Sequence, residues 1–171
     1  LEFRRVLFRS LKHPKYLDKS SFEIFQRSLR RCIISPSSIL LHRTVFDQVG
    51  WFDESLPACE DFDFWLRLLL RFNIDFLDED LVIKHGGHSD QLSKSVWGLD
   101  RFRIRSLEKL LSNPALPADR LPMVLEVLIE KTLILEQGAR KRLKKREARK
   151  YERRKSAYVS LLEMTMAGEN S

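Results

Sequence analysis

The sequence is poor in several features that mark large protein classes. It contains no run of about 18 apolar residues, so no membrane-spanning helix is predicted. Its two cysteines, Cys32 and Cys59, form no C-x-x-C pair, which argues against a disulfide framework and favours a reducing compartment. No secretory signal and no internal repeat is recognisable. These absences lead us to expect a cytoplasmic globular protein.

What is present is a chain of ordinary globular composition with an uneven charge. The 171 residues are 43% apolar and 10% aromatic, which is enough for one domain with a core. The net charge is +7, but residues 139–155 alone hold eleven Lys/Arg against two Glu, a local +9 that leaves −2 for all other residues. The basic character therefore belongs to the tail of the chain.

The first ten residues, LEFRRVLFRS, have neither an initiator methionine nor a turn or capping pattern. Glu2 and Phe3 are the residues that a common restriction site encodes, and residues 7–10 can be read from a common sequencing adapter. We therefore expect residues 1–10 to be a cloning or assembly scar and leave them out of the fold prediction.

The pattern predicts mixed α/β structure up to about residue 112. A capped helix begins at Ser20 and Ser21, and a short helical turn ends at Gly50, a usual residue just beyond a helix end. The other expected elements are extended segments at 33–34 and 38–41, a helix at 60–72, strands at 74–77 and 81–84 and a polar loop at 85–93.

The remainder of the chain is predicted to be helical. A long helix is expected over residues 95–112, where Asn113 and Pro114 end it. Asp119 is expected to cap the next helix, and Gly138 is a predicted break before the basic tail. Lysine, arginine, glutamate and alanine favour a helix in that tail.

The helix expected at 60–72 is apolar around most of its circumference, which indicates a buried helix. Asp63, Arg67 and Arg71 are four residues apart and form its one polar stripe. Glu60 and Asp61 open the helix, where the partial positive charge and unpaired N–H groups favour carboxylates. Taken alone, this acidic pair fits simple helix capping.

The surrounding residues carry a longer pattern. Residues 49–67 read V-G-W-F-D-E-S-L-P-A-C-E-D-F-D-F-W-L-R. This string resembles the V-G-G-F-D-E-x-L-x-x-x-E-D-x-D-L-W-L-R pattern of family 2 glycosyltransferases of the GT-A fold. The resemblance covers roughly residues 22–112 and does not reach the helical tail. It implies an α/β fold, namely a truncated GT-A-like mixed sheet followed by a helical C-terminal extension.

The resemblance also implies roles for the acidic residues. Asp61 would be the general base that takes the proton of an acceptor hydroxyl, and Glu60 its partner at the helix start. By the same resemblance, transfer from a nucleotide-sugar donor would invert the anomeric carbon. Asp53 and Glu54 are acceptor contacts or turn residues, and Trp51, in place of the usual glycine, either stacks on a sugar or packs.

The loop at 85–93 is the expected neighbour of the donor. The resemblance places His88 near the donor diphosphate or the divalent metal, and a solvated turn is the alternative. His85 and His88 lack further ligands nearby in sequence, so a zinc site is not favoured. The residues of this region that can contact the donor diphosphate are His88, Gln91, Ser93 and Lys94.

The donor-binding half of such an enzyme is missing from the pattern. No β-α-β unit and no Asp-x-Asp motif precede residue 33, so the Mg²⁺ or Mn²⁺ cofactor expected in a full-length enzyme has no such site here. The acidic run 78–80 follows Asp61 instead of preceding it, so we interpret it as a turn between strands. We expect a fragment of an enzyme of cell-envelope or polysaccharide synthesis, inactive alone, whose parent uses a nucleotide-sugar donor and a glycan or lipid-linked acceptor.

The basic tail leaves a second functional class open. It is a solvated helix, a surface that binds the inner face of a membrane, or a nucleic-acid contact, although no motif or aromatic platform supports the last. A non-catalytic adaptor that uses this tail is the alternative to the glycosyltransferase fragment. The expected organisation is residues 1–10 as a scar, 11–112 as a partial glycosyltransferase domain and 113–171 as a helical extension.

Overall fold

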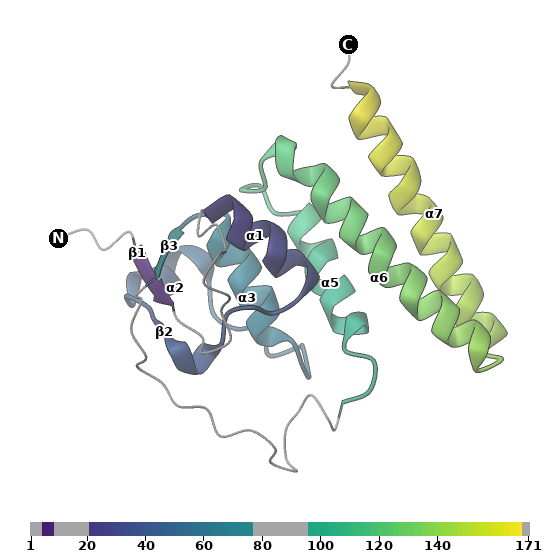
Figure 1. Ribbon diagram of the computed structural model, residues 1–171, viewed down its shortest axis with the longest axis horizontal. Coiled ribbons are helices and arrows are strands. Elements are labelled where there is room, and N and C mark those ends of the chain that lie inside the picture. The colour runs from purple at the N-terminus through teal and green to yellow at the C-terminus, as the bar shows by residue number, and fades with distance from the viewer. Residues whose placement is uncertain (1–4, 9–20, 77–95, 169–171) are drawn as a thin grey trace. The chain divides into compact units, whose positions relative to one another are not determined.

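The computed structural model describes residues 5–8, 21–76 and 96–168 (Figure 1). The predicted strand at 81–84, the turn at 78–80 and His88, Gln91, Ser93 and Lys94 lie outside these ranges. The chain divides into two compact units, Leu1–Trp97 and Gly98–Ser171, which are described separately. The domain boundary at residue 112 is predicted from the extent of the family motifs and not from contacts within the fold, so it stays a prediction.

The described part of the first unit is built mainly from three helices. The helix α1, Ser21–Arg30, begins where the serine pair predicts it, and it buries Ile24, Phe25 and Leu29. The short elements that follow are the 3₁₀ turn η1 (Pro36–Ser38), the strand β2 (Ile39–Leu40) and the helix α2 (Thr44–Val49). The buried helix α3 (Glu60–Leu69) and the strand β3 (Asn73–Phe76) complete the described part of this unit.

The helix α3 is buried on nearly all sides, as its composition predicts. Six of its apolar side chains are at most 3% exposed, and Asp63 is buried with them at 2%. The helix ends at Leu69 rather than at residue 72 because the amides of Arg71 and Phe72 both bond to the Leu68 carbonyl and close the last turn. The apolar core of α3 consists of Phe62, Phe64, Trp65, Leu66, Leu68 and Leu69.

The described strands form one small sheet in the order β2-β1-β3. The strand β1, Arg5–Phe8, pairs antiparallel with β2 and parallel with β3, with Val6 opposite Ile74. Residues that we set aside as a scar thus occupy the middle of this sheet, and their origin stays a prediction. The described chain is otherwise mostly helical, so the larger mixed sheet of a GT-A fold also stays a prediction.

The described part of the second unit consists of helices, and two of them, α5 and α6, begin at residues other than those predicted. The helix α5 spans Asp100–Leu111 and begins five residues later than predicted, after Gly98 with its φ of 70°. Asp119 lies within the 3₁₀ turn η2 (Ala118–Arg120) and caps no helix. The helix α6, Leu121–Lys141, begins with Pro122 in its first turn, where the missing N–H costs nothing.

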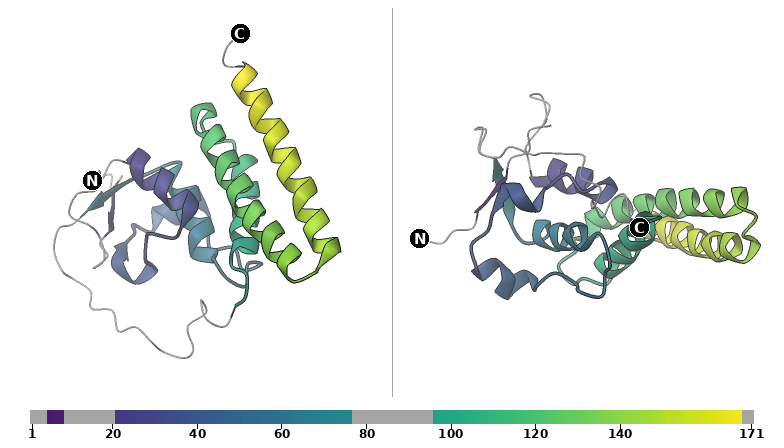
Figure 2. Two further views of the ribbon diagram at one scale, coloured as in Figure 1. Left: turned by 45° about the vertical axis from the view of Figure 1, so that its right-hand side comes forward. Right: turned by 90° about the horizontal axis from the view of Figure 1, so that it is seen from below.

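The predicted break at Gly138 is also wrong, because α6 continues through it. The chain turns instead at residues 142–144, and the basic tail forms the helix α7, Lys145–Gly168, as its composition predicts. Helices α6 and α7 lie side by side along their lengths (Figure 2). No helix in the described ranges has the length and hydropathy needed to cross a bilayer.

Ion pairs join the helices of this unit. The ammonium of Lys131, a residue only 4% exposed, lies 3.1 Å from the carboxylate of Asp100 and thereby links α6 to α5. Burial acts to raise the pKa of Asp100, but Lys131 and Arg103 outweigh it and hold that pKa below its ordinary value. Tyr158 donates to Glu108, and burial together with that carboxylate raises the pKa of Tyr158 to about 12.

Candidate functional site

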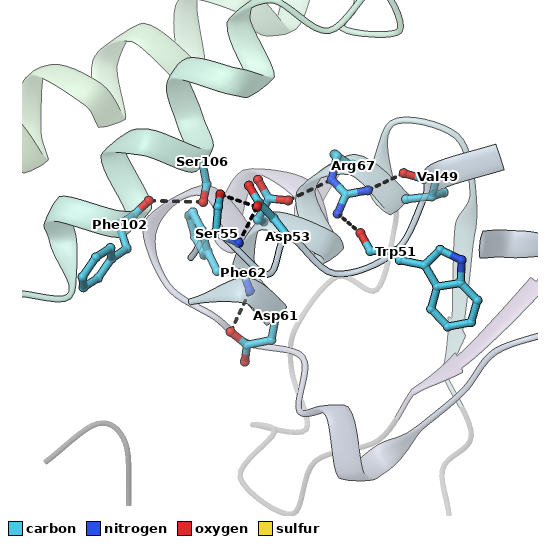
Figure 3. Close-up of polar contacts among 10 residues, drawn as sticks. Val49, Trp51, Asp53, Ser55, Asp61, Phe62, Arg67, Phe102 and Ser106 are labelled. Atoms are coloured by element: carbon cyan, nitrogen blue, oxygen red, sulfur yellow. Dashed lines mark hydrogen bonds and ion pairs between the residues drawn. The ribbon is translucent and has the colours of Figure 1, made fainter. Parts of the chain in front are cut away.

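One arginine fixes the loop that carries the motif. Arg67, on α3, donates from Nε to the Asp63 carboxylate at 2.9 Å, one turn earlier on the same helix. Its two terminal nitrogens donate to the backbone carbonyls of Val49 and Trp51, the latter at 2.9 Å (Figure 3). The Asp63 side chain is only 1% exposed, so the charge of Arg67 balances a buried carboxylate. The polar stripe predicted from the sequence is therefore confirmed at Asp63 and Arg67. Through Arg67 it also binds the preceding loop to α3.

Gly50 gives the loop its direction. The end of α2 is closed by a hydrogen bond of 2.9 Å from the Gly50 amide to the Phe46 carbonyl, and Gly50 has a φ of 79°. A Cβ there would lie 3.6 Å from the Arg67 guanidinium, which is ordinary contact. Glycine is therefore required at this position by its backbone angle and not by a lack of space.

Aromatic rings hold the loop from the other side. Trp51 stacks on Phe46 with ring centroids 4.4 Å apart, yet the Trp51 side chain is 72% exposed. Phe52 stacks on Phe64 at 4.6 Å and is half-buried, so it anchors the loop against α3. One face of the Trp51 ring therefore packs while much of the side chain remains accessible, which is compatible with both interpretations drawn from the sequence.

The two acids of the loop differ. Asp53 accepts hydrogen bonds from the Ser55 amide at 2.9 Å and from the Ser55 hydroxyl at 2.5 Å, which forms a tight local turn. Glu54 is exposed and has no ion pair or side-chain hydrogen bond to any described residue. Asp53 therefore stabilises the turn, and Glu54 is the more accessible of the two carboxylates for a ligand.

The start of α3 has an unusual backbone. Cys59, the residue just before the helix, has a φ of 66° and a ψ of 23°, a left-handed conformation that is uncommon outside glycine. Its side chain makes no capping bond, and the half-buried Glu60 makes no ion pair within the described ranges. The acidic pair is thus not a conventional capping arrangement, and strained backbone of this kind is often found at functional sites.

Asp61 is held by both of its oxygens. Oδ1 accepts a hydrogen bond of 2.7 Å from the Phe62 amide, and Oδ2 accepts one of 3.2 Å from the Cys32 thiol. The same thiol lies 3.3 Å from the Ile34 carbonyl. The sequence gives no sign of the Cys32–Asp61 contact, because the residues are 29 positions apart and Cys32 belongs to no motif.

A basic hollow of about 290 Å³ lies at the end of α1, directly before Cys32. The spacing of its arginines, three residues apart and then adjacent, would have predicted a shared helix face. Such a group of cations suits an anionic ligand. The described residues that line it are Gln26, Arg27, Arg30 and Arg31.

The structure brings together part of the predicted site. Trp51, Asp53, Glu54, Glu60 and Asp61 all belong to the loop and helix start that Arg67 organises. The donor-side residues His88, Gln91, Ser93 and Lys94 lie outside the described ranges. Within those ranges, no three His, Cys, Asp or Glu residues are grouped as metal ligands.

Comparison with known proteins gives a consistent result. Residues 19–116 match the model of the family described as "Glycosyltransferase like family 2". An uncharacterized glycosyltransferase of Rickettsia felis is 34% identical over 88 residues, which cover 52% of this chain and 14% of that protein. One of Rickettsia typhi is 27% identical over 85 residues, covering 50% of this chain and 26% of that protein. The chain thus spans a small part of these relatives, and no solved structure matches it significantly.

The contact between Cys32 and Asp61 should slow the alkylation of the Cys32 thiol. A neighbouring carboxylate disfavours the thiolate, the form that reacts with alkylating agents. Asp61→Asn should therefore raise the rate of Cys32 alkylation by iodoacetamide at least about threefold, measured by mass spectrometry of the folded protein.

Two controls accompany this measurement. Asp47→Asn removes the charge of an exposed acid on α2 and should leave the Cys32 rate unchanged. The rate at Cys59 reports any general loss of structure. An unchanged Cys32 rate in Asp61→Asn would show that the contact does not persist in solution.

Proposed function

Because the chain belongs to the glycosyltransferase-like family 2, we propose that it supplies the acceptor side of an active site that moves a sugar from a nucleotide-sugar donor to an acceptor hydroxyl. The observation that carries this proposal is the placement of Asp61. It opens a buried helix, within the matched region, next to a loop with an accessible tryptophan and an accessible glutamate.

In the proposed reaction Asp61 is the general base. As the acceptor oxygen attacks the anomeric carbon, its proton passes to a carboxylate oxygen of Asp61, and the bond from that carbon to the diphosphate oxygen breaks. The leaving nucleoside diphosphate carries away the electron pair. A single displacement of this kind inverts the anomeric carbon.

The surroundings of Asp61 support that role. The bonds from the Phe62 amide and the Cys32 thiol fix the orientation of the carboxylate, while each oxygen has a second lone pair for an acceptor hydroxyl. The start of α3 favours negative charge at this position. A positioned carboxylate is what a weak nucleophile such as a hydroxyl requires.

The other predicted residues complete the proposed site. Trp51 offers a ring to the face of an acceptor sugar, and Glu54 and Glu60 offer carboxylates to its hydroxyls, while Asp53 shapes the turn between them. The arginines of the hollow on α1 suit a phosphate of the donor or of a lipid-linked acceptor.

A divalent cation, Mg²⁺ or Mn²⁺, would neutralise the leaving diphosphate in a full-length enzyme. The described residues contain no cluster of ligands that fits such an ion, so no step here is assigned to it. His88 is the residue we propose nearest to the metal, with Gln91, Ser93 and Lys94 at the diphosphate.

The match to the family favours this proposal over a purely non-catalytic adaptor. It covers residues 19–116, which include the whole acidic motif. We propose a cytoplasmic location for the reaction, with a product that belongs to a cell-envelope or polysaccharide glycan.

The base assignment predicts a large loss of turnover. In a full-length enzyme that contains this segment, Asp61→Asn should lower kcat at least about 100-fold, because the acceptor proton loses its base. The measurement is release of nucleoside diphosphate in the presence of acceptor.

Asp47→Asn, with the same change of charge on an exposed part of α2, should keep kcat within about twofold, as expected for a surface change remote from the chemistry. Normal turnover in Asp61→Asn would disprove the assignment.

A second prediction concerns the chain by itself. With no Asp-x-Asp motif before Asp61, it should show no binding of UDP- or GDP-sugars in the presence of Mn²⁺ by isothermal titration calorimetry. Binding with a micromolar Kd would mean that the donor site is built from residues of this chain.

A further inference from the structure

The turn between α6 and α7 gathers most of the unbalanced charge of the protein. We define residues 140–150 as the hairpin tip. The tip holds eight Lys/Arg and one acid, Glu147, which is a local net charge of +7. All eight basic side chains are exposed. This surface belongs to the second unit alone.

The ion pairs of the hairpin divide its cations into two groups. Away from the tip, Lys131 pairs with Asp100, Arg154 with Glu108 and Lys155 with Glu136. At the tip, Arg140 pairs with Glu136 and Glu152, and Lys144 pairs with Glu147. The tip cations without any carboxylate within 4.0 Å among described residues are Lys141, Lys145, Arg146, Arg149 and Lys150.

Leu143 lies at the apex of the hairpin tip, between the basic residues of α6 and those of α7. It is 84% exposed, more than any other large apolar side chain in the described ranges. Its φ is 57°, in the left-handed region. Neighbouring backbone bonds, from the Leu143 amide to the Arg140 carbonyl at 3.0 Å and from the Lys144 amide to the Ala139 carbonyl at 2.9 Å, identify the turn as a Schellman motif.

Leucine is a costly residue at that point of the motif. Glycine is usual there because a Cβ disfavours the left-handed conformation. The hydrophobic contact that commonly stabilises the motif is also missing, because the next residue is Lys144. Leu143 thus strains the turn, and its side chain buries almost no apolar surface that would offset this cost. This indicates that the side chain has a function other than stabilising the fold.

We propose that the hairpin tip docks on an anionic lipid bilayer, with Leu143 inserted among the acyl chains and the tip cations on the lipid headgroups. A bilayer surface offers both an apolar layer and negative charge, and it therefore complements both properties of the tip. Nucleic acid complements only the charge, because an apical leucine contacts no phosphate and the tip residues 140–150 include no aromatic side chain for base stacking.

The shape of the hairpin suits this mode of binding. Helices α6 and α7 run side by side and meet at a narrow turn (Figure 2). The apex therefore projects a single apolar side chain with cations on both flanks. Lysine and arginine side chains there can keep their charges at the headgroups while their methylene stems extend along the apolar boundary.

The test uses the whole chain and sedimentation with vesicles in 100 mM NaCl. The chain should bind vesicles of equal phosphatidylglycerol and phosphatidylcholine at least about tenfold more tightly than pure phosphatidylcholine. Leu143→Gly should lose about tenfold of that affinity through the lost apolar insertion. The same variant should melt at an equal or higher temperature, because glycine relieves the turn. A structural role for Leu143 would instead lower the melting temperature.

Charge is tested with matched triple variants. Lys145→Gln, Arg146→Gln and Arg149→Gln together should weaken binding at least about tenfold. Exposed arginines outside the tip and outside the hollow on α1 provide the same change of charge, and Arg43→Gln, Arg71→Gln and Arg105→Gln together should keep most of the affinity. Met164→Ala, at a side chain 71% exposed near the other end of α7, should also leave binding unchanged.

Three results would overturn the proposal. The first is unchanged affinity in Leu143→Gly, which would leave an electrostatic contact without insertion. The second is an equal loss in both triple variants, which would mean that net charge alone decides binding. The third is absence of binding to the anionic vesicles while duplex RNA binds, which would assign the tip to nucleic acid.

Discussion

The bonds of Arg67 hold together the part of the chain that the family pattern covers. One guanidinium neutralises the buried Asp63 and donates to two carbonyls of the loop that leads into α3. Without it, a carboxylate would be buried without a counter-charge, which costs several kcal/mol, about 3 to 5. The loop carbonyls of Val49 and Trp51 would also lose their donors. The arrangement of the loop that leads to the start of α3 therefore depends on this one side chain.

This arrangement separates two acids that are only two residues apart. Asp63 faces inward, is 2% exposed and is engaged by Arg67. Asp61 is half-buried at the start of the helix, where an amide and a thiol orient it. The same short motif thus contains a structural ion pair and a candidate base. Burial and the ion pair with Arg67 give Asp63 its structural role, whereas the role of Asp61 as a base is our proposal.

Much of this unit follows from local sequence rules. The apolar circumference of α3, the glycine that ends α2 and the four-residue spacing of Asp63 and Arg67 each predict what the structure shows. These features depend on residues close together in the chain. The contact between Cys32 and Asp61 does not, because it requires the fold to bring α1 and α3 together. The left-handed Cys59 is likewise invisible in the sequence, since cysteine has no preference for that conformation.

The second unit shows where local rules mislead. Gly138 and Asp119 are typical of a helix break and a helix cap, but tertiary packing overrides both preferences. The helix continues through Gly138 and ends at Lys141, and the turn that follows places Leu143, a residue with no turn preference, in the left-handed conformation. The concentration of charge in the tail was evident from composition. Its division into paired cations along the hairpin and a group of five tip cations with no carboxylate within 4.0 Å among the described residues required the structure.

The measurement that tests the central claim most directly compares two substitutions in this chain by urea unfolding. Asp61→Asn and Asp63→Asn each remove one negative charge from the same turn of α3, so their effects on net charge are equal. Asp63→Asn should lower the free energy of unfolding by about 3 kcal/mol because Arg67 loses its buried partner. Asp61→Asn should lower the free energy of unfolding by less than about 1 kcal/mol, because the hydrogen bonds that are lost can be replaced by bonds to water. Equal losses, or a larger loss for Asp61→Asn, would contradict the division of labour between the two acids.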